Sequence, residues 1–160
     1  MVRSRFTGRH AVDWRDDRIA SARDGLNPTL IAEMDSGYAV MADMQFLPGW
    51  CILLPKRNVD SLNALDAQER KSFLYDMSVL GDAILNVCKP VRVNYDILGN
   101  SDQYLHAHVY PRYAWEQEER LKLPVWLYEN HCWSDPKTGF SEERHGALMH
   151  SIRSYLMSHR

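Results

Sequence analysis

The chain has 160 residues, of which 45% are hydrophobic, 11% aromatic and 25% charged. This size and composition suit one globular domain and argue against a disordered or low-complexity chain. With 19 basic and 21 acidic side chains the formal charge is −2, so the chain lacks the basic field that binds long nucleic acid, and we expect no such partner.

The three cysteines are widely spaced, which argues against a disulfide framework. The chain has no run of 18 apolar residues, and no apolar segment follows the arginines of Met1–His10. These features predict neither a membrane span nor a secretory signal. We therefore expect a cytoplasmic protein with a single domain over residues 1–160.

The first predicted elements are a helix and a hairpin. An amphipathic stretch from about Asp13 to Arg23 predicts a short N-terminal helix, which a glycine and a proline would end. Two apolar runs follow, Leu30–Met34 and Tyr38–Met41, separated by the turn residues Asp35-Ser36-Gly37. That pattern predicts a β-hairpin.

A buried strand and a long helix come next. The continuous apolar run Trp50–Leu54 predicts a strand that ends at the surface, where Pro55-Lys56-Arg57 follows. Asp66 stands three residues before Glu69, the arrangement of a helix N-cap with its reciprocal partner. From Asp66 to about Val87 apolar residues recur at helical spacing, which predicts a long amphipathic helix.

The second half of the chain begins with two strand-like segments, Val91–Leu98 and Gln103–Tyr110, joined by turn-forming residues. After Pro111 the chain is aromatic and irregular until a last helix begins near Ser141. Strands and helices without regular alternation predict an α+β fold. We expect a mostly antiparallel five-stranded sheet with the long helix packed on it and a C-terminal helix.

The segment Tyr104–Arg112 carries the most chemical information. Side chains alternate along a strand, so Tyr104, His106, His108 and Tyr110 would share one face, and the intervening apolar residues would share the other. The apolar face would join the core while both imidazoles face a site. Two histidines at this spacing lie roughly 7 Å apart, close enough to touch one phosphate group.

Other roles for these histidines stay open. An isolated His-x-His also suits a structural or surface position, and neutral imidazole is the commonest transition-metal ligand. A cupin-type metal site needs a glutamate four or five residues after the second histidine, whereas Glu116 follows His108 by eight positions. We therefore expect no metal ligand among the site residues, and stoichiometric metal would favour the alternative.

The segment resembles the signature of the histidine triad (HIT) superfamily of nucleotide hydrolases and transferases. In that signature three histidines alternate with apolar residues. His106 and His108 occupy the second and third positions, and Tyr104 stands where the first histidine would be. Within that superfamily the sequence resembles the bacterial HIT-like nucleotide hydrolases of the diadenosine polyphosphate type.

The likeness extends upstream and spans about residues 30 to 115. Asp43–Trp50 followed by Ile52–Lys56 is similar to the family's acidic residue, Pro-Gly-His turn and strand end, with Trp50 in place of that histidine. Val93-Asn94 and Gly99-Asn100-Ser101 resemble the family's nucleotide- and phosphate-contacting strand and loop. The resemblance therefore implies a HIT-like fold, with its core at about residues 30–115 and a C-terminal extension at about 116–160.

The resemblance also implies catalytic roles. By position His106 would attack the α-phosphorus of a nucleotide to give a nucleotidyl-histidine, and His108 would bind phosphate oxygens. Imidazole is a competent nucleophile near neutral pH because its unperturbed pKa is about 6.5. The substrate-binding residues implied in the same way are Asp43 for the ribose, Asn94 for the phosphate or ribose, Gly99, Asn100 and Ser101 for the phosphate, and Tyr104.

Each of these positions has a second interpretation. Asn94 and Ser101 also suit the capping of turns, and Asp43 suits the surface. Lys56 and Arg112 could steer phosphates, although their places at strand ends favour structural roles.

The activity implied is that of a nucleotide phosphohydrolase or nucleotidyl transferase acting on dinucleoside polyphosphates or nucleoside phosphoramidates. The alternative is a catalytically weak nucleotide-binding or sensing module. We expect no required cofactor, although a divalent cation could accompany the nucleotide. The aromatic C-terminal third has more apolar surface than a small sheet would cover, so we expect it to pack around the site or to form a homodimer interface.

Overall fold

The computed structural model describes residues 13–159, so the segment Met1–His10 considered above lies outside the described residues. The strands are β1 (Leu30–Glu33), β2 (Gly37–Met41), β3 (Cys51–Pro55), β4 (Arg92–Asp96) and β5 (Ala107–Arg112). The helices are α1 (Arg18–Arg23), α2 (Ala67–Cys88), α3 (Glu118–Leu121), α4 (Asn130–Ser134) and α5 (Glu142–Ser158), with short 3₁₀ turns at Leu62–Ala64, Val125–Leu127 and Pro136–Thr138.

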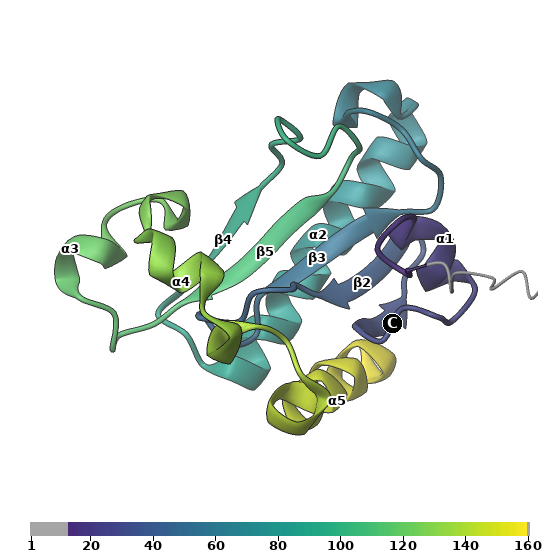
Figure 1. The fold of residues 1–160 in the computed structure, drawn as a ribbon. Coiled ribbons are helices and arrows are strands. Elements are labelled where there is room, and N and C mark those ends of the chain that lie inside the picture. Colours follow the sequence, from purple (N-terminus) through teal and green to yellow (C-terminus); the bar gives the residue numbers. More distant parts are fainter. Residues whose placement is uncertain (1–12, 160) are drawn as a thin grey trace, which may run out of the picture.

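The five strands form one antiparallel sheet in the order β1-β2-β3-β5-β4 (Figure 1). The predicted α+β fold, with its long helix and C-terminal helix on the sheet, is confirmed. None of the helices between residues 13 and 159 combines the length and apolar character needed to cross a membrane.

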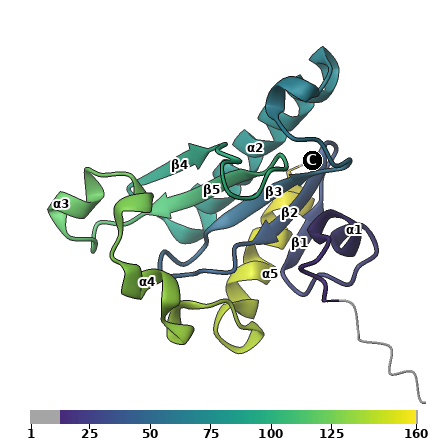
Figure 2. The ribbon, with the colours of Figure 1, turned by 45° about the horizontal axis from the view of Figure 1, so that its top comes forward.

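The two faces of the sheet are covered differently (Figure 2). Helices α2 and α5 pack on one face and form the main core, in which Phe73 and Ile84 of α2 and Ile152 of α5 meet the strands. On the opposite face α1 contributes Ile19 to a second cluster, and the segment after β5 contributes Val125 to a third. The second face is therefore covered at its two ends, and a site lies between them.

Local sequence signals explain the longest helix and the first hairpin. The Asp66 side chain accepts hydrogen bonds from the backbone N–H groups of Gln68 (2.8 Å) and Glu69 (2.9 Å), and the Glu69 carboxylate accepts from the Asp66 N–H (3.0 Å), so the predicted capping box is present. At Gly37 a Cβ would lie 1.9 Å from the Leu54 carbonyl oxygen. The close approach of β2 to β3 therefore requires glycine there.

Three predicted boundaries are wrong. α1 begins at Arg18 rather than about Asp13, because the Asp17 side chain caps the helix by accepting from the Ala20 N–H (2.8 Å). The strand predicted over Val91–Leu98 is shorter, at Arg92–Asp96.

The strand predicted over Gln103–Tyr110 runs instead over Ala107–Arg112. It starts later because the Leu105 N–H donates to the Val59 carbonyl, outside the sheet (2.7 Å). It continues through Pro111 because β3 pairs only with residues 107–109, so Pro111 has β4 as its sole neighbour in the sheet. A residue without an N–H is tolerated at such a position.

The predicted alternation of side chains holds despite the shifted strand. Leu105, Ala107 and Val109 belong to the main core under α2 and α5. His106 and His108 point to the opposite face, where they line a pocket. The sequence pattern therefore identified the face that carries the histidines.

Candidate active site

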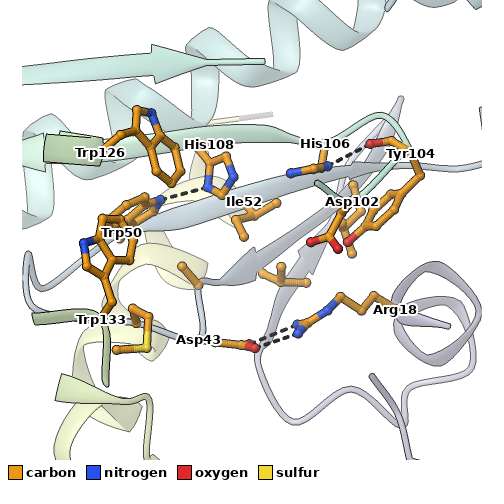
Figure 3. Close-up of a pocket in the computed structure, with 14 residues that line it drawn as sticks. Arg18, Asp43, Trp50, Ile52, Asp102, Tyr104, His106, His108, Trp126 and Trp133 are labelled. Atoms are coloured by element: carbon orange, nitrogen blue, oxygen red, sulfur yellow. Dashed lines mark hydrogen bonds and ion pairs between the residues drawn. The ribbon is translucent and has the colours of Figure 1, made fainter. Parts of the chain in front are cut away.

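A pocket of about 180 Å³ opens on the face of the sheet opposite α2, between α1 and the segment that follows β5 (Figure 3). Val40, Ile52 and Leu54 form its apolar floor. Its remaining lining residues are, by kind, the two histidines, the aromatic residues Trp50, Tyr104, Trp126 and Trp133, the charged residues Arg18, Asp43 and Asp102, and Ala42 and Met44. The pocket thus combines an apolar interior with a few polar groups, as small-molecule sites do.

His106 is held in one tautomer by the main chain. Its Nδ1 lies 2.8 Å from the Tyr104 carbonyl oxygen. A carbonyl only accepts hydrogen bonds, so Nδ1 carries the proton and, in the neutral ring, Nε2 keeps its lone pair. Because the partner is a backbone oxygen, this bond does not depend on which side chain residue 104 carries.

His108 is held in the complementary tautomer. The Trp50 Nε1–H donates to His108 Nδ1 at 3.2 Å, and an indole N–H only donates, so Nδ1 accepts and the proton lies on Nε2. The His106 and His108 rings are 5.0 Å apart, nearly perpendicular at 77°. The site therefore pairs one imidazole with a free Nε2 lone pair and one with an Nε2–H donor.

Burial lowers the pKa of His108 to about 4, and the neighbouring His106 adds to this shift. The side chain is therefore neutral at pH 7. In the unfolded chain the same group has an ordinary pKa of about 6.5. Between these two values the unfolded protein binds a proton at His108 that the folded protein does not.

The free energy of unfolding should consequently fall as the pH decreases from about 6.5 towards 4, by at most about 1.4 kcal/mol per pH unit from His108. Urea unfolding across this pH range measures the contribution of His108 to stability. The wild type should show it, and His108→Gln should not. His150→Gln, at an exposed position of α5, is the matched control. Parallel stability curves for the wild type and His108→Gln would contradict the expectation.

An aromatic wall closes the pocket beside His108. The Trp126 ring lies 5.0 Å from the His108 ring and stacks on Trp133 at 5.5 Å and 10°. The Trp126 Nε1–H donates to Asp96 Oδ2 (2.9 Å), which also accepts from the Tyr110 hydroxyl (2.6 Å). The predicted packing of the aromatic C-terminal third around the site is thus observed for two of its tryptophans.

Asp43 lies across the pocket from the histidines, and its side chain is 38% exposed. Both of its oxygens accept hydrogen bonds from Arg18, Oδ1 from Nη1 at 2.9 Å and Oδ2 from Nη2 at 2.6 Å. Tyr104 lies nearer to the histidines, with its ring 4.9 Å from that of His106. Asp43, Tyr104 and the two histidines therefore line one pocket.

The remaining predicted site residues do not line this pocket. Asn94 lies on β4 and accepts a hydrogen bond from Arg112 Nη1 (3.3 Å). Gly99, at a φ of +71°, borders an adjacent hollow that Tyr104 and His106 also line. Asn100 and Ser101 are exposed on the same loop.

Lys56 and Arg112 lie away from the histidine pocket, in ion pairs. Lys56 contacts Glu33 at 2.6 Å on the surface. Arg112 is buried against Glu116, with side chains that are 3% and 0% exposed. These contacts therefore support structural roles for Lys56 and Arg112 rather than the steering of phosphates.

Sequence reasoning did not assign a site role to the polar and aromatic lining residues Arg18, Trp50, Asp102, Trp126 and Trp133. Arg18 is one of several charged residues in the N-terminal segment, and nothing in its spacing distinguishes it. Trp126 and Trp133 carried a signal, the aromatic enrichment after Pro111, which predicts their region but not their positions.

Among the comparisons with known proteins, only the comparison with solved structures finds similar proteins. No family model matches the chain, and no curated protein matches it. A histidine triad protein from Marinobacter aquaeolei is similar at a TM-score of 0.68 and 20% identity, over 81% of this chain and 88% of that one. A histidine triad protein from Sinorhizobium meliloti is similar at 0.67 and 19%, over 79% and 87%. The diadenosine triphosphate hydrolase of Plasmodium falciparum is similar at 0.59 and 15%, over 82% and 78%.

Proposed function

The chain has the fold of the histidine triad proteins, and on that premise we propose that it is a nucleotide phosphohydrolase or nucleotidyl transferase acting at an α-phosphate. The observation that carries the proposal is the pair of complementary tautomers at His106 and His108. One neutral imidazole offers a nucleophilic Nε2, and its neighbour offers an Nε2–H donor. The proposed substrates are dinucleoside polyphosphates or nucleoside phosphoramidates.

In the proposed first step His106 Nε2 donates its lone pair to the α-phosphorus. A P–N bond forms, and the P–O or P–N bond to the leaving group breaks, so that the leaving group departs with the bonding electrons. The nucleotidyl-imidazolium that results is positively charged, and its Nδ1–H remains bonded to the Tyr104 carbonyl, which favours the charged ring. Water or another acceptor then attacks phosphorus, the P–N bond returns its electrons to Nε2, and the acceptor loses a proton.

The proposed role of His108 is to donate its Nε2–H to a phosphate oxygen on which charge develops. A preorganised donor of this kind stabilises the transition state without rearrangement. Trp50, which replaces a histidine of the family pattern, supports the role because its N–H occupies His108 Nδ1 and leaves the proton on Nε2. The indole thus performs an orienting task for which a second imidazole is not required.

The substrate-binding roles are also proposals. Asp43 and Tyr104 line the histidine pocket, which supports the assignment of the ribose to Asp43. Gly99 beside His106 supports an approach of phosphate along the loop of Gly99, Asn100 and Ser101. The role of Asn94 stays a prediction from the family resemblance. That the reaction requires no cofactor, and that a divalent cation can accompany the nucleotide, both stay predictions.

A turnover screen tests the proposal. Adenosine and guanosine polyphosphates and phosphoramidates are incubated with the protein, and the products are separated by chromatography. Release of a nucleoside monophosphate or its transfer to an added acceptor would support the proposal. Saturable nucleotide binding without turnover would favour the alternative, a sensing module with the same pocket. If the protein shows neither nucleotide binding nor turnover, both the enzyme and the sensing module are ruled out.

We further propose a cytoplasmic homodimer. Trp115 is 62% exposed and Leu127 58% exposed, so the C-terminal third presents apolar surface that the monomer leaves uncovered. Sedimentation at micromolar concentration should give about twice the chain mass of 18.6 kDa. A species of 18.6 kDa under these conditions would contradict the dimer.

A further inference from the structure

The orientation of the His106 ring determines on which side of the pocket a leaving group lies. Its Nδ1 faces the Tyr104 carbonyl, and the two nitrogens of an imidazole point in nearly opposite directions, so Nε2 faces away from Tyr104 (Figure 3). In an in-line displacement the leaving group stands opposite the attacking atom. The group that leaves phosphorus is therefore directed towards His108 and the aromatic wall of Trp126 and Trp133.

A carboxylate stands behind this aromatic wall. Asp96 on β4 is the register partner of His108 on β5, so the two side chains share one face of the sheet. Its Oδ2 accepts from the Trp126 Nε1–H (2.9 Å) and from the Tyr110 hydroxyl (2.6 Å). Burial lowers the pKa of His108, and the charge of Asp96 acts in the opposite direction. The negative charge of Asp96 therefore reaches the side of the pocket on which the leaving group lies.

The charged residues that line the pocket offer no spare cation. They are Arg18, Asp43 and Asp102, and Arg18 is already bound to both oxygens of Asp43. Within residues 13–159, no ion pair includes Asp96 or the exposed Asp102. A chain of further phosphates would thus meet uncompensated carboxylates, and like charges at short range are unfavourable.

The same arrangement suits a positive charge. Trp126 lines the pocket and is 36% exposed, and the face of an indole ring attracts ammonium groups. The hydrogen bond from its N–H to the Asp96 carboxylate polarises the ring in the sense that strengthens this attraction. An ammonium group beside Trp126 would therefore gain from both the ring and the carboxylate behind it.

We propose that the pocket selects nucleotides whose leaving group carries a positive charge, and that Asp96 and Trp126 determine this specificity. The inference rests on the proposed function and narrows its substrate class. Conjugates of a nucleoside monophosphate with a cationic amine, joined through a P–O or a P–N bond, are favoured over dinucleoside polyphosphates. The roles proposed for His106 and His108 are unchanged, because Asp96 and Trp126 act on the leaving group and not on phosphorus.

The test uses conjugates of adenosine monophosphate that differ only in the charge at the end of the leaving group. Phosphoramidates of 1,3-diaminopropane, n-butylamine and β-alanine have nearly the same length and end in an ammonium, a methyl and a carboxylate group. In the wild type, kcat/KM for the ammonium conjugate should exceed that for the carboxylate conjugate by about 10- to 100-fold, with the neutral conjugate between them. Diadenosine tetraphosphate without divalent cations should also be a poorer substrate than the ammonium conjugate.

Two variants test the residues. Asp96→Asn keeps the size and one acceptor oxygen but removes the charge, so the ratio of ammonium to carboxylate conjugate should fall by about fivefold or more. Trp126→Leu should lower kcat/KM for the ammonium conjugate relative to the neutral one by about three- to tenfold. A purely structural loss would lower the turnover of all the conjugates alike and leave these ratios unchanged. Asp82→Asn, at an exposed position of α2 on the other face of the sheet, is the matched control and should keep the wild-type ratios.

The outcomes separate this inference from the proposed function. If the wild type turns over the three conjugates equally well, or prefers the carboxylate conjugate or the tetraphosphate, the inference fails and the proposed function stands. Wild-type ratios in both Asp96→Asn and Trp126→Leu would also overturn it. If the wild type binds the conjugates without turning them over, their relative affinities in the wild type and the two variants decide the inference in the same way. If the wild type binds no nucleotide or conjugate, both proposals fail.

Discussion

His106→Ala should abolish turnover, with a fall of at least about 10⁴-fold, because it removes the atom proposed to form the bond to phosphorus. Nucleotide affinity should stay within about tenfold, or about 1.4 kcal/mol, since His106 is one of many lining groups. Steady-state product formation measures the first effect and calorimetric titration the second. The intact mass of the quenched wild-type reaction should show a nucleotidylated protein that the variant does not form.

His108→Ala separates the two histidines. It keeps the nucleophile and removes one donor, and loss of one oxyanion donor commonly costs about 10²–10³ in rate. Residual activity and a trapped adduct should therefore remain measurable. An active His106→Ala protein would refute the nucleophile assignment, and an equal loss of bound metal in both variants would point instead to the metal-binding interpretation.

Glu116→Gln should lower the free energy of unfolding by about 3–5 kcal/mol, because it leaves the buried Arg112 charge without its counter-charge. The two side chains share three contacts of 2.9 to 3.1 Å. Burial opposes ionisation of Glu116, but hydrogen bonds from Arg112 and Tyr128 leave its pKa below the usual value. Denaturant unfolding monitored by circular dichroism measures the change.

The chain offers a matched control for this variant. Glu118 and Lys122 form another i,i+4 pair at 2.6 Å, but their side chains are 78% and 70% exposed. Glu118→Gln should change stability by less than about 0.5 kcal/mol. The double variant Arg112→Met with Glu116→Leu should recover much of the loss, since apolar residues of similar size often replace a buried pair at little cost. Equal effects of both glutamine substitutions would contradict the prediction.

The elements with periodic sequence signals were predictable from the sequence. The capping box at Asp66 and the alternation around His106 each depend on residues within a few positions of one another. For the same reason the sequence placed both histidines on one face, and the resemblance to histidine triad proteins identified the fold. Local chemistry and fold agree in these segments.

The features that were not predictable depend on contacts between distant segments. The late start of β5 follows from the hydrogen bond between Leu105 and Val59, and the neighbours of Asp43 follow from the packing of α1. Arg18 shows the limit most clearly, because its partner is 25 positions away and no period relates the two. Such pairs become visible only when the sheet brings the segments together.

The tryptophans that line the histidine pocket have a consequence for spectroscopy. Three of the five tryptophans surround one cavity, with ring centres of Trp50, Trp126 and Trp133 separated by 5.5 to 5.9 Å. At these separations the excited states of the indoles couple, so their near-ultraviolet circular dichroism and fluorescence depend on how the rings are arranged. A molecule that enters beside His108 displaces water from these rings, and the intrinsic emission of the unlabelled protein therefore becomes a direct optical record of whether the cavity is filled.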